Sequence, residues 1–221
     1  MDVEVVLPCL NEAEALPSVL STLSRLLDGW PVLVVDNGST DDTAEVARAH
    51  GARVVGEPRP GYGAAVHTGI VHARAEFVAV LDGDGSLDPT VLPLLADAVH
   101  SGRADLAVGR RVPDGAGVWP WHARVGNTVI AALLRAQGVP VHDIAPVRVA
   151  RREALLALEV ADRAFGYPLE LLLRAGKAGW RIEELPVRYS RRAGGTSKVS
   201  GSVKGTARAV RDMSGLLLTR L

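Results

Sequence analysis

The chain has 221 residues, and its 25 lysines and arginines balance 25 aspartates and glutamates, which gives a formal net charge of zero. A neutral chain lacks the global positive field that would favour nucleic acid as a partner. With 48% hydrophobic and 23% charged residues, the composition is that of a globular protein long enough to bury a core, and the one cysteine, Cys9, excludes an internal disulfide.

The first half of the chain alternates short apolar runs, typical of buried strands, with segments of helical periodicity. Strands are predicted at residues 3–7, 31–35, 53–55, 77–81 and 106–108, and helices at residues 11–27, 42–50, 63–73 and 89–101. This alternation predicts an α/β fold with a mostly parallel sheet and helices on both faces. Right-handed crossovers place the carboxyl ends of such strands along one edge, so the loops that begin at Pro8, Asp36, Gly56 and Asp82 should converge on one crevice.

The second half departs from this rhythm. Helices are predicted at residues 119–137, 151–158 and 168–178, a strand at 181–187, and an irregular or strand-like segment at 141–149. Residues 191–201 are rich in glycine, serine and basic side chains and predict a loop. The chain contains no evident repeat or linker, so we expect one domain at residues 1–200 followed by a C-terminal amphipathic helix at residues 201–221.

The loop after the predicted strand at 77–81 reads Asp82-Gly83-Asp84-Gly85-Ser86. Two carboxylates one residue apart, at the carboxyl end of a buried strand, stand where open α/β sheets bind ligands. Glycines beside Asp84 allow the backbone to turn sharply and to approach a ligand closely. Hard oxygen ligands at this spacing suit Mg²⁺ or Mn²⁺ shared with a diphosphate, whereas the alternative is a solvated turn of the kind that Asp and Gly readily form.

Three further loops at the same predicted edge carry polar or glycine residues. Asn11 can cap the helix that follows it, and the helix dipole favours Glu12, so both have a purely structural explanation. Asp36 directly follows a strand and is well placed to accept hydrogen bonds from a base or ribose. Gly61 and Gly63 precede a predicted helix and would allow a phosphate or sugar to approach its N-terminus, although no Gly-Lys-Ser/Thr follows to make a P-loop.

These loops together resemble the nucleotide-sugar half of a family 2 glycosyltransferase with the GT-A fold, and later segments resemble its polyprenyl- and dolichyl-phosphate sugar synthase branch. The segments that carry the resemblance are residues 8–12, 36–41, 61–65, 82–84, 143–148, 165–170 and 192–198. The similarity runs from about Val3 to about Arg211. It implies a Rossmann-like GT-A domain and an inverting, metal-dependent transfer of a hexose from a nucleotide sugar to a polyprenyl phosphate.

The resemblance also implies roles for individual residues. Those expected to bind the nucleotide sugar are Pro8, Glu12, Asp36, Gly38, Gly63, Asp82 and Glu170. Asp82 and Asp84 would hold Mg²⁺ or Mn²⁺, and the expected catalytic residues are Asp84, Asp143, Arg192 and Lys198. Arg110 and Arg124 resemble the basic residues that meet the acceptor phosphate. Ser86 stands where relatives often have a glutamine, and Arg148 stands where many have an aromatic residue.

Several of these residues also have structural explanations. Asp143 is either close to the sugar and acceptor or is a buried carboxylate paired with Arg148 or another base. Arg192 and Lys198 belong either to a loop that closes over the diphosphate or to a solvated basic loop. Glu170 follows a proline and fits a carboxylate at a helix start.

Besides polyprenyl-phosphate glycosylation, two other functions stay open and a third is disfavoured. The same donor chemistry could serve a small metabolite or a glycan, and a non-catalytic nucleotide-sugar-binding protein could retain the fold. A nucleotidyltransferase is disfavoured because the loop at residues 8–12 is neither glycine-rich nor basic. The donor candidates are UDP-glucose and GDP-mannose, with overall likeness favouring UDP-glucose.

The last part of the chain determines how a lipid would be reached. Residues 186–212 carry many bases and a single acid, and residues 202–221 form an amphipathic pattern that would lie on an anionic membrane surface or pack on the domain. No signal-peptide pattern and no stretch near the roughly 20 apolar residues of a membrane span occur in the sequence. We therefore expect a cytoplasmic protein, peripheral at the cytoplasmic face of the membrane or bound to a membrane-protein partner.

Overall fold

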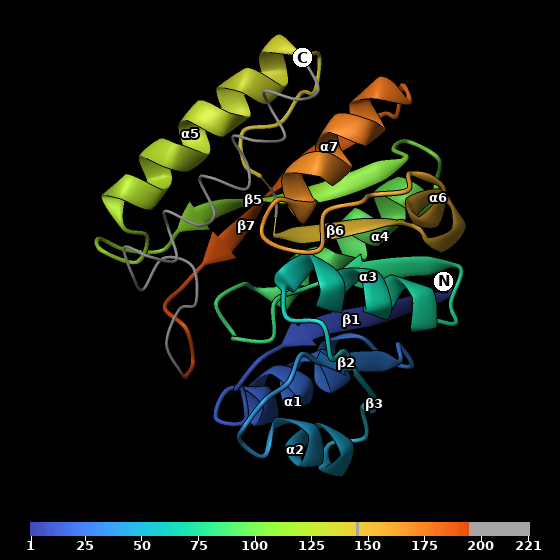
Figure 1. The fold of residues 1–221 in the computed structure, drawn as a ribbon, viewed down its shortest axis with the longest axis vertical. Coiled ribbons are helices and arrows are strands. Elements are labelled where there is room, and N and C mark those ends of the chain that lie inside the picture. Colours follow the sequence, from blue (N-terminus) through green and yellow to red (C-terminus); the bar gives the residue numbers. More distant parts are fainter. Residues whose placement is uncertain (145, 195–221) are drawn as a thin grey trace.

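The computed structural model describes residues 1–144 and 146–194. Its centre is a seven-stranded sheet in the order β3-β2-β1-β4-β6-β5-β7 (Figure 1). The strands are β1 (Val3–Cys9), β2 (Val32–Asp36), β3 (Arg53–Gly56), β4 (Phe77–Val80), β5 (Leu106–Pro113), β6 (Val147–Arg151) and β7 (Ile182–Tyr189). The predicted strands are therefore confirmed, although β5 continues five residues beyond its predicted end.

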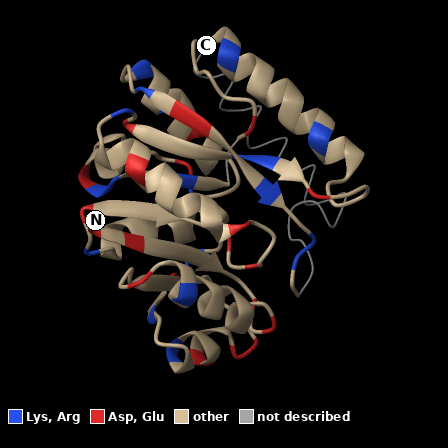
Figure 2. Ribbon diagram, turned by 180° about the vertical axis from the view of Figure 1, so that it is seen from behind, with Lys and Arg blue, Asp and Glu red and all other residues tan. Residues whose placement is uncertain are grey.

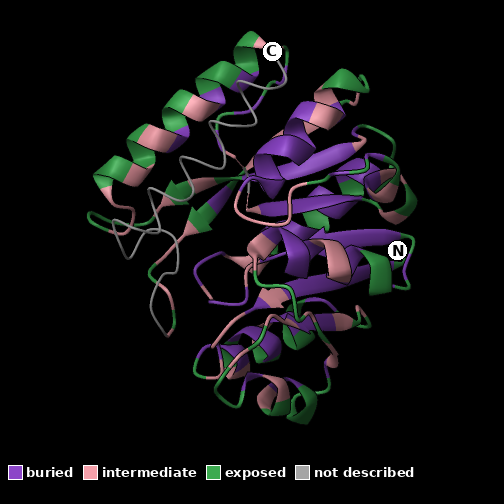
Figure 3. Ribbon diagram, in the orientation of Figure 1, coloured by how far each residue is buried: buried purple, intermediate pink, exposed green. Residues whose placement is uncertain are grey.

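Helices cover both faces of this sheet, as the sequence predicts. One face is packed by α1 (Leu16–Leu26), α2 (Thr43–Ala49) and α4 (Leu92–His100), the last preceded by a 3-10 turn, η1 (Pro89–Val91). The other face is packed by α3 (Tyr62–His72), α5 (Trp121–Ala136), α6 (Arg152–Ala157) and α7 (Tyr167–Lys177). The central strands are buried on both sides (Figure 3), which explains their nearly continuous apolar sequences.

One strand of the sheet, β6, runs antiparallel to the others, and its direction decides which residues of the second half of the chain lie at the carboxyl end of β4. Strands β1 to β4 are mutually parallel where they pair, whereas β6 is antiparallel to both β4 and β5. Residues that enter β6 therefore lie at the same edge as residues that leave β4, and Arg148 pairs in register with Val80. The mostly parallel sheet is confirmed, and the segment predicted as irregular or strand-like is irregular first and a strand from Val147 onward.

The predicted start of the first helix is wrong. Helix α1 begins at Leu16, five residues later than expected, and Asn11 does not cap it. Asn11 has a φ of 55° and joins two loops instead: its backbone N–H donates to Oγ of Ser39 at 3.0 Å, and its Oδ1 accepts from the N–H of Thr40 at 2.7 Å. The residue is thus fixed by a neighbouring loop, a contact that local sequence does not reveal.

The structure does not describe the C-terminal part of the chain for which the sequence predicts a helix. The predicted helix at residues 201–221 and Lys198 lie outside the described residues. Within residues 1–144 and 146–194, no helix is long and apolar enough to cross a membrane.

Candidate active site

Two aspartates form the centre of the candidate site, at the carboxyl end of β4 between β1 and β6. Asp84 is buried, and its Oδ1 accepts a hydrogen bond from the N–H of Ser86 at 2.8 Å. Asp82 is half-buried and accepts a hydrogen bond from the hydroxyl of Tyr62 at 3.2 Å. Gly83 has to be glycine, because a Cβ there would lie 2.5 Å from Sγ of Cys9. The glycine thus brings both carboxylates to one point of the sheet edge.

The environment makes Asp82 an unusually weak acid. Burial and, to a smaller extent, the charge of Asp84 raise its pKa, and Arg148, the Tyr62 hydroxyl and Arg111 lower it; the net result is a pKa of about 7. Two neighbouring carboxylates in a partly dry site repel each other, and a bound cation would relieve that repulsion. The pair is therefore suited to hold a cation.

The guanidinium of Arg192 lies between the loop after β1 and the loop after β4. Arg192, beyond the end of β7, places Nη1 2.7 Å from Oδ2 of Asp84, and its Nη2 donates to Oε1 of Glu12. The segment that carries it is held against the aspartate loop by two backbone hydrogen bonds: Ala193 donates to Asp84 at 2.9 Å, and Ser190 donates to Ser86 at 2.8 Å. The structure thus brings together three predicted residues, Glu12, Asp84 and Arg192, that are far apart in sequence.

The loops after β1 and β2 form the neighbouring part of the crevice. Pro8 is the second-last residue of β1, and the backbone N–H of the buried Glu12 donates to Oγ1 of Thr43 at 2.9 Å. Asp36 ends β2, where its Oδ1 accepts from the N–H of Ser39 at 3.0 Å and closes a turn through Gly38, whose φ is +80°. The predicted convergence of these loops with the aspartate loop is confirmed.

Gly63 and Glu170 have contacts that explain them within the protein itself. A Cβ at Gly63 would lie 2.6 Å from Cβ of Tyr167, and the N–H groups of Gly63 and Ala64 donate to the carbonyls of Ala164 and Arg163. The close approach predicted at this helix start is therefore present, but the partner is the chain's own segment before α7. Glu170 is fully buried and accepts hydrogen bonds from the N–H groups of residues 161 and 162 and from Arg174.

Asp143 belongs to an ion pair with Arg111 at the same edge. Its carboxylate accepts from Nε of Arg111 at 2.8 Å, from Nη2 at 2.6 Å and from the Arg111 backbone N–H at 2.9 Å. The Arg111 guanidinium also lies 4.1 Å from the ring centroid of Trp119. Burial disfavours the charged form of Arg111, but its hydrogen bonds and attraction to Asp143 outweigh this and raise its pKa. Asp143 is thus paired with a base, and the base is Arg111 instead of Arg148.

Of the arginines on β5 and α5, the one that acts on the aspartate loop is neither Arg110 nor Arg124, the two that the resemblance indicates. Arg110 is half-exposed and lies 3.6 Å from Glu184 of β7, whereas Arg111 is the one whose charge acts on Asp82. Arg124 is exposed on α5. Sequence reasoning missed Arg111, and the alternation of side chains along β5 could have found it, because neighbouring strand residues point to opposite faces.

The residues at the edge fit the predicted Mg²⁺ or Mn²⁺. Asp82 and Asp84 supply hard oxygen ligands, and the guanidinium on Asp84 already marks a position that attracts positive charge. In the part of the chain that the structure describes, no group of three or more His, Cys, Asp or Glu side chains is placed to hold a metal alone. Two carboxylates suit a cation that completes its shell with substrate phosphates and water.

Comparison with known proteins agrees with this fold. The model of glycosyl transferase family 2 matches residues 4–157. An uncharacterized glycosyltransferase of Mycobacterium tuberculosis is 58% identical over 211 residues, 95% of each chain. Dolichyl-phosphate hexose transferase of Haloferax volcanii is 36% identical over 197 residues, 88% of this chain and 86% of that protein.

A solved structure supports the same assignment. Glucosyl-3-phosphoglycerate synthase of Mycobacterium tuberculosis, crystallised with Mn²⁺, UDP and glucosyl-3-phosphoglycerate, superposes with a TM-score of 0.78 at 26% identity, covering 99% of this chain and 79% of that one. The fold is therefore that of a GT-A enzyme. The chain belongs to glycosyl transferase family 2 and resembles dolichyl-phosphate hexose transferase within it.

Proposed function

We propose that this glycosyltransferase moves a hexose from a nucleotide sugar to a polyprenyl phosphate, with inversion at the anomeric carbon. The observation that supports this most is that a group of carboxylates and an ion pair containing an arginine lie together at one sheet edge. Glu12, Asp82 and Asp84 form the acidic group, and the pair of Arg111 with Asp143 lies beside them. Donor and phosphate acceptor need such adjacent sites.

The acidic group would serve the donor. Asp82 and Asp84 would hold Mg²⁺ or Mn²⁺, which when bound neutralises the charge that develops on the departing diphosphate. Arg192 would exchange its contacts with Glu12 and Asp84 for the diphosphate once donor and cation enter, and Lys198 would contact the same diphosphate. Pro8, Asp36, Gly38 and Gly63 would shape the nucleoside pocket. The Mn²⁺ and UDP bound by glucosyl-3-phosphoglycerate synthase support a metal and make UDP-glucose one donor candidate beside GDP-mannose.

The ion pair of Arg111 with Asp143 would serve the acceptor. A phosphate is already ionised at neutral pH, so it needs orientation toward the anomeric carbon more than deprotonation. Arg111, held over the Trp119 ring by Asp143, offers a preorganised guanidinium for that phosphate, and Arg124 would supply a second charge from α5. Asp143 would act by orienting Arg111 and by facing the positive charge that develops on the sugar.

One helix offers a surface for reaching a lipid. Along α5, Trp121, Val125, Val129 and Leu133 recur every four residues and are 76%, 55%, 54% and 44% exposed. The helix carries arginines and no acids (Figure 2), a combination that favours an anionic lipid surface. We propose that this face makes a peripheral contact with the cytoplasmic side of a membrane. Changing Trp121 and Val129 to Glu together should abolish co-sedimentation with phosphatidylglycerol vesicles and leave activity on detergent-dispersed acceptor intact.

A second acceptor class has specific support. Glucosyl-3-phosphoglycerate synthase shares the fold, and its crystallised product is glucosyl-3-phosphoglycerate, which is water-soluble. The same Arg111 site would then orient a soluble phosphorylated acceptor. A dispersed polyprenyl phosphate and 3-phosphoglycerate should therefore be compared directly as acceptors.

The test is a donor panel of UDP-glucose and GDP-mannose with Mg²⁺ or Mn²⁺ and each of these two acceptors. Lipid-linked sugar from one donor, abolished by EDTA, is the expected result. Transfer to 3-phosphoglycerate alone would replace the lipid acceptor by a soluble one. Donor binding without transfer to either acceptor would refute both candidates.

A further inference from the structure

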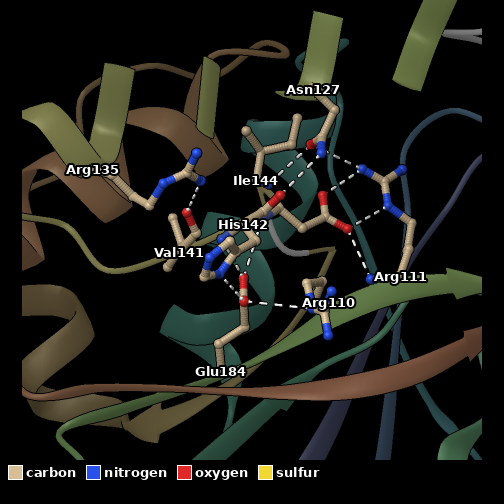
Figure 4. A network of polar contacts seen from close by, with 9 residues as sticks. Arg110, Arg111, Asn127, Arg135, Val141, His142, Ile144 and Glu184 are labelled. Atoms are coloured by element: carbon tan, nitrogen blue, oxygen red, sulfur yellow. Dashed lines mark hydrogen bonds and ion pairs between the residues drawn. The ribbon is translucent and has the colours of Figure 1, made fainter. Parts of the chain in front are cut away.

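Glu184 of β7 is a nearly buried carboxylate that the roles given above leave without a function. Its side chain is 8% exposed. Oε1 accepts hydrogen bonds from the backbone N–H groups of His142 at 2.6 Å and Asp143 at 3.1 Å (Figure 4). Oε2 contacts Nδ1 of His142 at 2.8 Å and Nε of Arg110 at 3.6 Å. A carboxylate is costly to bury, so contacts this numerous indicate a specific task.

The segment that Glu184 holds has no sheet or helix to fix it. Between α5 and β6, the carbonyl of Val141 accepts from Arg135 at 2.9 Å, and Oδ1 of Asn127 accepts from the N–H of Ile144 at 3.1 Å. Side chains from α5 and β7 thus take the place of secondary-structure partners along residues 141–144. Glu184 provides the two backbone bonds nearest to Asp143.

Those two bonds set the direction of Asp143. Its N–H points at Glu184, while its carboxylate points at Arg111, so the peptide is held between two strands of the sheet. Arg110 and Arg111 are consecutive residues of β5, and they meet Glu184 and Asp143 respectively. The position of the Arg111 guanidinium therefore depends on the segment that Glu184 fixes.

We propose that Glu184 is a positioning residue for transfer: it fixes the peptide of residues 142–143 so that Asp143 orients Arg111 toward the acceptor phosphate. This rests on the acceptor role proposed above for Arg111. Glutamine at position 184 keeps one oxygen for the backbone N–H groups but turns an amide N–H₂ toward the Arg110 guanidinium and the His142 ring. Alanine removes every contact. The two substitutions therefore weaken the clamp by different amounts.

The first experiment is kinetic. Glu184→Gln should lower kcat/KM for the acceptor by about tenfold, the loss typical of one hydrogen bond to a charged group, and Glu184→Ala should lower it further. Donor affinity, measured by calorimetry, should stay within about twofold. The matched control is Glu183→Gln, the neighbouring residue of β7, which pairs with the exposed Arg103 at 3.6 Å and should leave both quantities unchanged.

A double-mutant cycle separates positioning from general stability. If Glu184 acts through Asp143, Glu184→Gln added to Asp143→Asn should cost little more than Asp143→Asn alone. Losses that multiply, or an equal loss of donor affinity, would overturn the proposal.

A second measurement does not depend on the acceptor being a lipid. Hydrogen exchange at the amides of residues 142 and 143 should accelerate by about tenfold or more in Glu184→Ala, with core strand amides unchanged. Unchanged exchange there would overturn the clamp itself. Faster exchange in a protein whose wild type transfers no sugar would refute the proposed function and leave the clamp established.

Discussion

The two ends of the sheet edge are built in different ways. At β1, β2 and β4 the candidate donor residues stand at the ends of parallel strands or in the loops directly after them, and the hydrogen bonds of those strands fix where the loops begin. At β5, β6 and β7 the candidate acceptor residues depend on an irregular segment held by the side chains of Asn127, Arg135 and Glu184. The first region is fixed by its backbone and the second by a polar network, so single substitutions should have different consequences in each.

The largest effect is expected at Asp84. Asp84→Ala removes a carboxylate of the proposed cation pair, and transfer should fall by about a thousandfold or more. Rates with saturating donor and titrated Mn²⁺ measure this. Asp88→Asn is the control, since Asp88 only caps η1 and should keep near wild-type turnover. Asp84→Ala with normal turnover would remove the donor assignment from this region.

Arg111 tests the polar network. Arg111→Lys loses the two-pronged contact with Asp143 and the guanidinium contact with the Trp119 ring, so kcat/KM for the acceptor should fall by about a hundredfold while donor affinity holds. Arg103→Lys, on an exposed arginine paired with Asp97, is the control. A loss of donor affinity in Arg111→Lys would contradict the separation of donor and acceptor sites between the two regions.

Gly69 tests how tightly α3 packs on the parallel strands of the first region. A Cβ at Gly69 of α3 would lie 2.2 Å from Cγ1 of Val6, so Gly69→Ala should lower the free energy of unfolding by about 2 kcal/mol. Gly126 of α5 has nothing within 4 Å of such an atom, and Gly126→Ala should be neutral or stabilise by about 0.5 kcal/mol. Urea denaturation gives both values. Equal effects would contradict the contrast between the two regions.

The smallest effect concerns pH. The pKa of Asp82 is raised in the folded protein to about 7, so without metal the folded state binds this proton more tightly than the unfolded state. Its contribution to stability is therefore full below the unfolded pKa and is lost as pH rises toward 7. Asp82→Asn should stabilise metal-free protein by about 1 kcal/mol at pH 8 and much less at pH 4. A gain that is independent of pH would show that the carboxyl does not titrate this way.

Sequence reasoning was most successful where residues follow directly from strands. The Asp82-Gly83-Asp84 loop and the Asp36 turn were placed correctly, because the end of a short apolar run marks a sheet edge. It failed at Asn11, whose partner is a loop of residues 39 and 40, and at Arg111, whose partner is Asp143. The roles of the site residues stay predictions.

By itself, the sequence determined the α/β alternation, the family and the aspartate pair, since periodicity and short motifs are local properties. Only the tertiary structure decided that β6 runs antiparallel, that Arg192 reaches Glu12 and Asp84, and that Glu184 holds the segment before β6. The reason is physical: these contacts join residues 41 to 180 positions apart in the chain, and their partners are selected by the order of strands in the sheet.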